Sequence, residues 1–239
     1  MGAAIVIVVP SCNQKSVESN FLEVWALTLE TLSEDEILKG VSASLSNALD
    51  LIDEGIILLE GKKFARAYTL FQFATEEIGK SRLLFSLLIS IKSGEEINWN
   101  KFNKEFVTHT DKTKGAIVFD HIAILLLSNY NLDDEKKIAE YKEYNHTLVK
   151  EENNVKASND NKNNSLYVGI KDGKITSPKE LITEVMATTL KENAQRRYIF
   201  SLKLFDLLLN TDFDRLVKDI IEFKKNPPAD LYKRGRVLL

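Results

Sequence analysis

The sequence predicts an all-α fold, a helical bundle with long antiparallel helices and a short β-hairpin or extended insertion near residues 165–176. Apolar residues recur at three- and four-residue intervals along residues 37–59, which is typical of an amphipathic helix. The preceding Ser33–Glu36 has the pattern of a capping box. Gly61 separates this helix from a second one over residues 62–93, and so short a connection predicts an antiparallel pair.

The second of these helices is expected to be the central one. Between residues 64 and 88 apolar side chains occupy nearly every face, which is typical of a helix covered by neighbours on all sides. One turn of it nevertheless carries Glu76, Glu77 and Lys80. Because a buried charge is costly unless it is paired and hydrogen-bonded, this turn requires partners from other parts of the chain.

A third helical pattern runs over residues 99–126. Its first half is polar and aromatic, and its second half is almost continuously apolar. On a single helix Phe102, Phe106 and His109 share one face, and Lys112 lies one turn beyond the histidine. We therefore expect the aromatic side chains to anchor this helix while the polar ones lie beside the central helix.

The next segments are more polar. Residues 133–152 show a charged, lightly amphipathic pattern and are expected to form a surface helix. Residues 153–164 contain six asparagines and no bulky aliphatic residue beyond Val155, so we interpret them as a mobile loop. Two β-prone stretches within residues 166–176 then flank the turn Lys171–Gly173, which indicates the short hairpin.

A further helix is predicted after the hairpin. Ser177 is a good capping residue, Pro178 suits the first helical position and Glu180 completes a capping box. The apolar pattern that follows continues to Leu208, and a last short helix is expected over residues 212–223.

These segments define one helical domain, residues 33–226, with an N-terminal appendage before it (residues 1–32) and a basic C-terminal tail after it (residues 227–239). The apolar run Ala3–Val9 is too short to cross a bilayer, which takes about 20 residues, and no basic residues precede it as in a secretory signal. A single cysteine, Cys12, fits a reducing compartment. We therefore expect a cytoplasmic protein that does not bind membranes.

Composition and motifs argue against several classes of function. The net charge of −3 gives no overall basic field, so any contact with RNA must be local. The sequence contains no Gly-x-Gly-x-x-Gly and no P-loop motif. Glu143-x-x-His146 has the spacing of a di-iron bundle, but such a site needs a second pair and two more glutamates. We expect neither a metal nor a cofactor.

The charged turn of the central helix permits two interpretations. Glu76 and Lys80 stand at i and i+4 in the order that favours an ion pair, which indicates structural support inside the core. Alternatively, Gly79 leaves room for a helix or backbone to approach closely, and the apolar surroundings then indicate an active or binding site that includes Glu77.

His109 also permits two interpretations. It is one of three histidines, and beside Lys112 it could act as a general acid/base while the lysine holds a phosphate. A lone histidine on a core-facing side is as often a hydrogen-bonded structural residue.

Together these stretches resemble a known family. Residues 71–80, with their Glu-Glu-Ile-Gly-Lys motif after an aromatic-rich helix, are similar to the AbiV family, an abortive-infection branch of the HEPN superfamily. The Phe-x-x-His-x-x-Lys signature of that family is matched by residues 106–112, and its Leu-Tyr-Val turn by residues 165–173. The likeness covers roughly residues 38–208.

The resemblance implies an HEPN-like helical bundle, a homodimer and a role in anti-phage defence by arrest of the infected cell. Many HEPN proteins are metal-independent ribonucleases with an Arg-x(4–6)-His motif, in which arginine holds the phosphate and histidine acts on the ribose 2′-hydroxyl. Here no arginine precedes a histidine by that spacing; the nearest substitutes are Lys104 with His109 and Lys114 with His121. Lysine lacks the planar fork by which arginine binds phosphate.

We therefore expect a defence protein that binds a phage protein or part of the translation apparatus and arrests the infected cell at translation. The predicted polar cluster, which serves binding or structure, comprises the charged residues of the two motifs: Glu76, Glu77, Lys80, Lys104, His109 and Lys112. The alternative is a ribonuclease in which His109 is the acid/base and Lys80, Lys104 or Lys112 holds the scissile phosphate of RNA.

Overall fold

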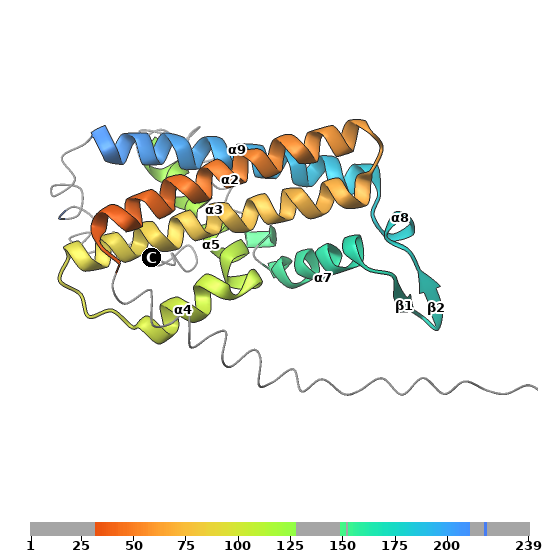
Figure 1. Cartoon of the computed structure of the whole chain (residues 1–239), viewed down its shortest axis with the longest axis horizontal. Coiled ribbons are helices and arrows are strands. Elements are labelled where there is room, and N and C mark those ends of the chain that lie inside the picture. The colour runs from red at the N-terminus through yellow and green to blue at the C-terminus, as the bar shows by residue number, and fades with distance from the viewer. Residues whose placement is uncertain (1–31, 128–148, 152, 211–217, 219–239) are drawn as a thin grey trace, which may run out of the picture.

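The computed structural model describes residues 32–127, 149–151, 153–210 and 218. Its elements in chain order are α2 (Glu34–Glu60), α3 (Phe64–Lys92), α4 (Trp99–Val107), α5 (His109–Leu127), α7 (Val155–Leu166), β1 (Gly169–Lys171), β2 (Lys174–Thr176), α8 (Pro178–Leu181) and α9 (Glu184–Asn210). Figure 1 shows α2, α3 and α9 side by side along the bundle, with the small hairpin at one end. The predicted all-α fold is confirmed.

Helices α2 and α3 form the predicted antiparallel pair. Ser33 caps α2, its Oγ accepting a hydrogen bond from the backbone N–H of Glu36 at 3.2 Å. The carboxylate of Glu36 pairs with Lys39 at 2.7 Å instead of returning to the backbone of Ser33, so one half of the expected capping box is present. Gly61 ends α2, and Gly94 follows the end of α3 with a φ of +67°, both as predicted.

Helix α3 is the centre of the bundle. It contacts every other described helix, namely α2, α4, α5, α7, α8 and α9. Phe71, Ala74 and Ile78 on it are fully buried, and buried side chains recur on all of its faces. The prediction that residues 64–88 form the central helix is confirmed.

The expected single helix over residues 99–126 is wrong, because the chain breaks at Thr108. This residue is extended, with a ψ of 121°, and its hydroxyl donates to the carbonyl of Lys104 at 2.6 Å. A threonine side chain can compete in this way with the helical backbone. Phe102 and Phe106 stack on each other within α4, and His109, beyond the break, begins α5.

The expected loop at residues 153–164 is also wrong, because most of it is helix α7. Val155, Lys162 and Ser165 of this helix are buried, with exposed fractions of 3%, 3% and 0%. Helix propensity is a weak prior that tertiary contacts override. Here the contacts are largely polar, which is why an apolar pattern could not reveal them.

The predicted hairpin at residues 165–176 is present. β1 and β2 pair antiparallel, with Ile170 opposite Ile175. The turn residues Asp172 and Gly173 have φ values of 51° and 74°, as the type I′ turn of a tight hairpin requires. The guanidinium of Arg66 donates to the carbonyl of Leu166 at 3.3 Å and so fixes the base of the hairpin to α3.

The helix expected from Ser177 to Leu208 is divided in two. Ser177 and Glu180 form the predicted capping box of the short α8. The chain is then extended at the buried Ile182, and Thr183 caps α9 by accepting from the backbone N–H of Met186 at 3.2 Å. Thr183 is therefore a helix-capping signal that is present in the sequence, within an apolar pattern that looks continuous.

The remaining predictions concern residues outside the described ranges. They include the N-terminal appendage, most of the expected helix at residues 133–152, the short helix at residues 212–223 and the basic tail. Within the ranges that the structure does describe, no helix combines the length and apolar character needed to cross a membrane.

Candidate functional site

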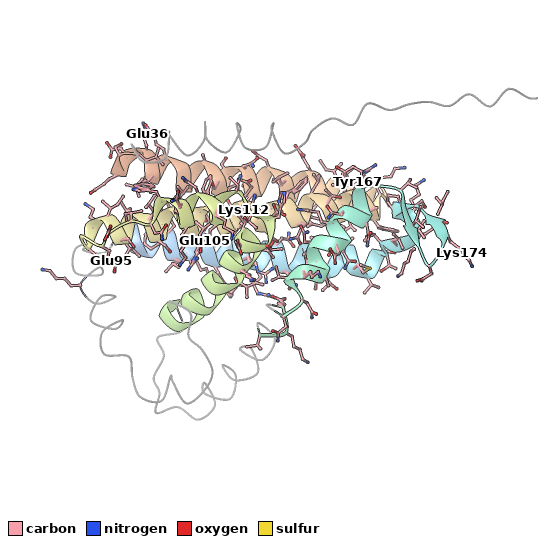
Figure 2. The ribbon with its side chains drawn as sticks, turned by 90° about the horizontal axis from the view of Figure 1, so that it is seen from below. Glu36, Glu95, Glu105, Lys112, Tyr167 and Lys174 are labelled. Carbon is pink, nitrogen blue, oxygen red and sulfur yellow. The ribbon has the colours of Figure 1, made fainter. Side chains whose placement is uncertain are left out.

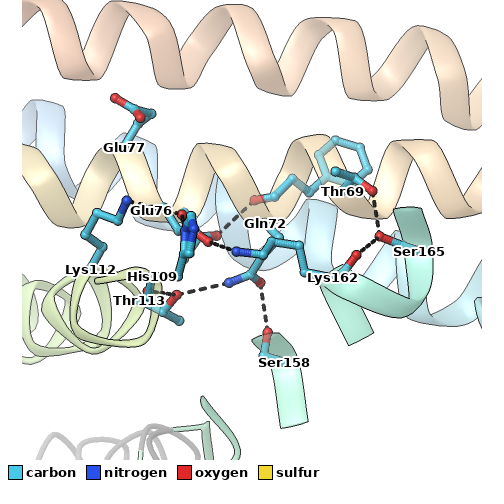
Figure 3. Close-up of polar contacts among 12 residues, drawn as sticks. Thr69, Gln72, Glu76, Glu77, His109, Lys112, Thr113, Ser158, Lys162 and Ser165 are labelled. Carbon is cyan, nitrogen blue, oxygen red and sulfur yellow. Dashed lines mark hydrogen bonds and ion pairs between the residues drawn. The ribbon is translucent and has the colours of Figure 1, made fainter. Parts of the chain in front are cut away.

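Glu76 of α3 lies among the side chains of two lysines and one histidine (Figure 3). Its Oε2 is 2.5 Å from Nδ1 of His109 and 3.5 Å from Nζ of Lys112, both on α5. Its Oε1 is 2.8 Å from Nζ of Lys162 on α7. These four residues, the Glu76 cluster, join three helices through a single carboxylate.

Most of the Glu76 cluster is inaccessible to solvent. The side chains of Glu76 and Lys162 are each 4% exposed and that of Lys112 is 8% exposed, whereas the His109 side chain is 55% exposed. Burial lowers the pKa of Lys112, and the nearby carboxylate of Glu76 acts in the opposite direction. Glu76 forms an ion pair with each of the two buried lysines, so the buried carboxylate and both ammonium groups lie beside an opposite charge.

Gly79 allows α3 and α5 to cross at this point. A Cβ atom at Gly79 would lie 1.8 Å from the carbonyl oxygen of Lys112, closer than any real side-chain contact. On the opposite helix, a Cβ at Gly115 would lie 3.4 Å from the carbonyl oxygen of Gly79. The predicted close approach of a backbone at Gly79 is therefore present, and it brings His109 and Lys112 within reach of Glu76.

The expected ion pair between Glu76 and Lys80 is wrong. Lys80 pairs with Glu77 at 2.6 Å, and the two side chains are 26% and 16% exposed. The Nζ of Lys80 also lies 5.9 Å from the centre of the Phe106 ring. Since the oxygens of Glu76 are directed to α5 and α7, the Glu77–Lys80 pair forms a separate and more accessible contact beside the Glu76 cluster.

Lys104 does not join the cluster. It lies exposed on α4, and within the described ranges no ion pair links its side chain to Glu76. Lys104 belongs to α4, which ends before the extended Thr108, whereas His109 and Lys112 belong to α5, which begins after it.

A row of neutral polar contacts extends the Glu76 cluster along α3. Gln72 donates through Nε2 to the hydroxyl of Thr113 at 3.0 Å and accepts through Oε1 from Ser158 at 2.8 Å. One turn away, the hydroxyl oxygens of Thr69 and Ser165 lie 2.5 Å apart. Helix α7 is therefore attached to α3 by hydrogen bonds as well as by an ion pair.

Sequence reasoning missed the α7 side of this arrangement, although a signal exists. Thr69, Gln72 and Glu76 recur at three- and four-residue spacing on an otherwise apolar helix. Within the asparagine-rich segment, Ser158, Lys162 and Ser165 recur at the same spacing. Matching polar stripes of this kind predict two helices that face each other.

The arrangement limits the chemistry that the cluster can perform. Lys112 and Lys162 are buried and directed at Glu76, so a phosphate in solution does not reach either ammonium group. His109 alone is accessible, and Glu76 holds its Nδ1. A carboxylate that orients a histidine in this way is a known arrangement for acid/base work, but two lysines share this carboxylate.

A second buried charge cluster, which sequence reasoning also missed, joins α5 to α9. The Nε of Arg197 donates to Oδ2 of Asp120 at 2.9 Å, and the same guanidinium bonds to Glu151. Burial raises the pKa of Asp120 to about 6, although Arg197 and Arg196 act in the opposite direction. A lone aspartate in the apolar half of the third helical pattern was the available signal.

The described residues form no recognisable metal site. Across those ranges, no three side chains of histidine, cysteine, aspartate or glutamate are grouped as a metal ion would require. The Glu143-x-x-His146 pair lies outside the described residues.

Comparison with known proteins bears on the identity of the chain. The family model HEPN_AbiV, described as AbiV, matches residues 36–199, which is more than half of the 239 residues. The matched range contains the Glu76 cluster, its crossing at Gly79 and the β1–β2 hairpin. No match was found among curated proteins or among solved structures. The chain therefore belongs to the AbiV family of HEPN proteins, and this membership indicates a role in abortive infection.

Proposed function

We propose that this protein acts in phage defence by binding a phage or host partner, and that this binding arrests the infected cell at translation. On this proposal the Glu76 cluster is a structural element that fixes how α3, α5 and α7 are arranged. The protein works in the cytoplasm as a homodimer, and the surface of the bundle rather than a catalytic centre carries its activity.

The burial of the two lysines in the Glu76 cluster is the observation that carries the proposal. Lys112 and Lys162 are 8% and 4% exposed and lie 3.5 and 2.8 Å from one carboxylate. A ribonuclease of this superfamily needs a cation that can reach the scissile phosphate. A cation already paired with a buried carboxylate is poorly suited to that task.

Complex formation tests the proposal. The purified full-length protein is incubated with phage-encoded proteins, produced singly, and stable complexes are sought by size-exclusion chromatography with mass measurement. We expect at least one stable complex and no cleavage of added cellular RNA. Cleavage of the RNA together with the absence of any complex would contradict the proposal.

A ribonuclease is the second candidate, and the accessible imidazole favours it. His109 is 55% exposed, and Glu76 binds Nδ1, which leaves Nε2 as the nitrogen for a substrate proton. Lys80 is more accessible than Lys112, with 26% against 8% of its side chain exposed, although it pairs with Glu77.

Two substitutions distinguish this candidate from the leading proposal. If His109 is the acid/base, His109→Ala abolishes RNA cleavage while the melting temperature hardly changes, because the ring is largely outside the core. Lys101→Ala, at a position of α4 whose side chain is 71% exposed, serves as the control. Equal cleavage by the wild type and His109→Ala would exclude the assignment of His109.

A further inference from the structure

The β1–β2 hairpin has an apolar face that none of the described elements covers. Figures 1 and 2 show it beyond the end of the bundle, with Lys174 near its tip. Val168, Ile170 and Ile175 are 66%, 80% and 77% exposed, so no described helix covers them. Exposed aliphatic side chains grouped in this way mark an interaction surface more often than single ones do.

The two faces of the hairpin differ in chemistry. Ile170 lies opposite Ile175, and Val168 precedes Ile170 by two residues, so these three side chains lie on one face. Lys171 lies opposite Lys174 on the other face. The hairpin therefore has an aliphatic face and a basic face.

In the part of the chain that the structure describes, no third strand pairs with the outer edges of the hairpin. Lys171 and Lys174 flank the two-residue turn, so they form a closely hydrogen-bonded pair, and the next pair, Ile170 and Ile175, directs its backbone N–H and C=O groups outward. An open edge of this kind is a template for another strand. A two-stranded sheet is only marginally stable alone, so a third strand would also stabilise it.

We propose that the hairpin binds an extended segment of the partner protein in which aliphatic and acidic residues alternate, and that this segment adds as a third strand. Its aliphatic side chains continue the face of Ile170 and Ile175, and its carboxylates lie beside Lys171 and Lys174. The hairpin is then the surface that binds the partner, and acidic and aliphatic residues are what it recognises. The inference rests on the partner binding proposed above.

Charge complementarity selects this occupant. Residues 166–179 contain three lysines and one acidic residue, Asp172. Two copies of the hairpin carry the same positive charge, which opposes their pairing with each other. The apolar run Ala3–Val9 of the same chain has no acidic residue to place beside Lys171 and Lys174. A strand of alternating acidic and aliphatic residues from another protein is complementary to both the basic face and the aliphatic face of the hairpin.

Binding of a model strand tests the inference. Fluorescence anisotropy is measured with the full-length protein and a labelled decapeptide of alternating valine and glutamate, compared with one of alternating valine and lysine. We expect the wild type to bind the acidic peptide about tenfold more tightly. Lys171→Glu with Lys174→Glu should reverse this preference, and Lys156→Glu with Lys203→Glu, an equal charge change on exposed positions of α7 and α9, should leave it unchanged.

The aliphatic face is tested separately. Ile170→Thr with Ile175→Thr keeps β-branched side chains, so the strands should persist while peptide binding falls about tenfold. Unchanged binding in this variant, or equal binding of both peptides by the wild type, would overturn the inference. A wild-type dimer that this variant converts to monomer would assign the surface to a second copy and would overturn it as well.

A phage challenge separates this inference from the proposed function. We expect the Ile170→Thr/Ile175→Thr variant to lose protection at wild-type levels of folded protein. Full protection by the variant, with the partner complex intact, would refute the role of the hairpin and leave partner binding standing. RNA cleavage by the purified wild type without a partner complex would refute the binding function, whatever the peptide measurements show.

Discussion

Glu76 and Lys162 form an ion pair with 2.8 Å between Oε1 and Nζ, although 86 residues separate them in the chain. Each side chain is only 4% exposed. The pair attaches α7, a helix rich in asparagine, to the centre of the bundle. Together with the contacts of His109 and Lys112, it makes one carboxylate the common point of three helices.

Replacing that carboxylate should destabilise the fold. Glu76→Gln keeps the shape of the side chain but leaves Lys112 and Lys162 buried without a charged partner. The loss of a partner in a buried ion pair costs about 3–5 kcal/mol. The neighbouring Glu77→Gln breaks the more exposed pair with Lys80 and should cost at most about 1 kcal/mol. Urea unfolding of both variants measures the difference; equal losses would show that the Glu76 cluster does not stabilise the bundle.

Lys162→Ala should loosen α7 while the rest of the bundle stays folded. The substitution removes the ion pair with Glu76 and the contact of Nζ with the Phe73 ring, whose centre is 5.6 Å away. Local opening of an element follows from the contacts that hold it. Hydrogen exchange should therefore accelerate about tenfold or more in residues 155–166 and remain unchanged in α2. Lys156→Ala, on the exposed face of α7, is the control, and similar exchange in both variants would refute this role of Lys162.

The crossing at Gly79 predicts an asymmetry between two glycines. Gly79→Ala places a methyl group 1.8 Å from the carbonyl oxygen of Lys112, so the helices must move apart. We expect a loss of about 3 kcal/mol or more, at the upper end for overpacked cores. Gly115→Ala meets its nearest atom at 3.4 Å and gains helix propensity, so its effect should lie within about 1 kcal/mol of zero. Thermal and urea unfolding give both values; equal effects would mean that α3 and α5 do not cross this closely.

Asp120 should give the protein a pH-dependent stability. Burial raises the pKa of its carboxyl group from 3.8 to about 6 in the folded protein. Because the folded state holds this proton more tightly than the unfolded chain, the contribution of Asp120 is largest below pH 3.8 and declines as the pH rises to about 6. The decline amounts to roughly 3 kcal/mol, from 1.36 kcal/mol per unit of pKa.

The variant Asp120→Asn isolates this contribution, since an amide does not titrate in this range. The unfolding free energy of the wild type minus that of the variant should decrease between pH 4 and 6, the interval set by the two pKa values, and level off above it. Urea unfolding at several pH values gives this difference. An increase over the same interval would mean that the bonds to Arg197 outweigh burial and lower the pKa of Asp120.

The sequence predicts the parts of the fold that depend on local, periodic signals. Apolar periodicity and the capping signals at Ser33, Gly61 and Gly94 locate α2 and α3, and the Asp-Gly turn locates the hairpin. The proximity of Glu76 and His109 follows from a family motif and a glycine that permits close approach.

Other parts of the fold depend on contacts between residues far apart in the chain, which no local sequence pattern reveals. Thr108 breaks a pattern that is continuous in hydrophobicity, because its hydroxyl bonds to the backbone one turn earlier. Lys162 lies in a segment with the composition of a loop, and only its partner 86 residues away makes that segment a buried helix. The ion pair of Asp120 with Arg197 likewise joins residues 77 positions apart. Such pairs can be identified only once the arrangement of the helices in space is known.

An experiment in phage-challenged cells tests most directly whether His109, at the edge of the Glu76 cluster, acts on RNA. Wild type and His109→Gln are expressed at equal levels of folded protein, and plaque formation, translation and the integrity of total RNA are followed after infection. Binding without catalysis predicts equal protection by both proteins, with arrested translation and intact RNA. Fragmented RNA with the wild type, and intact RNA with loss of protection in His109→Gln, would contradict it.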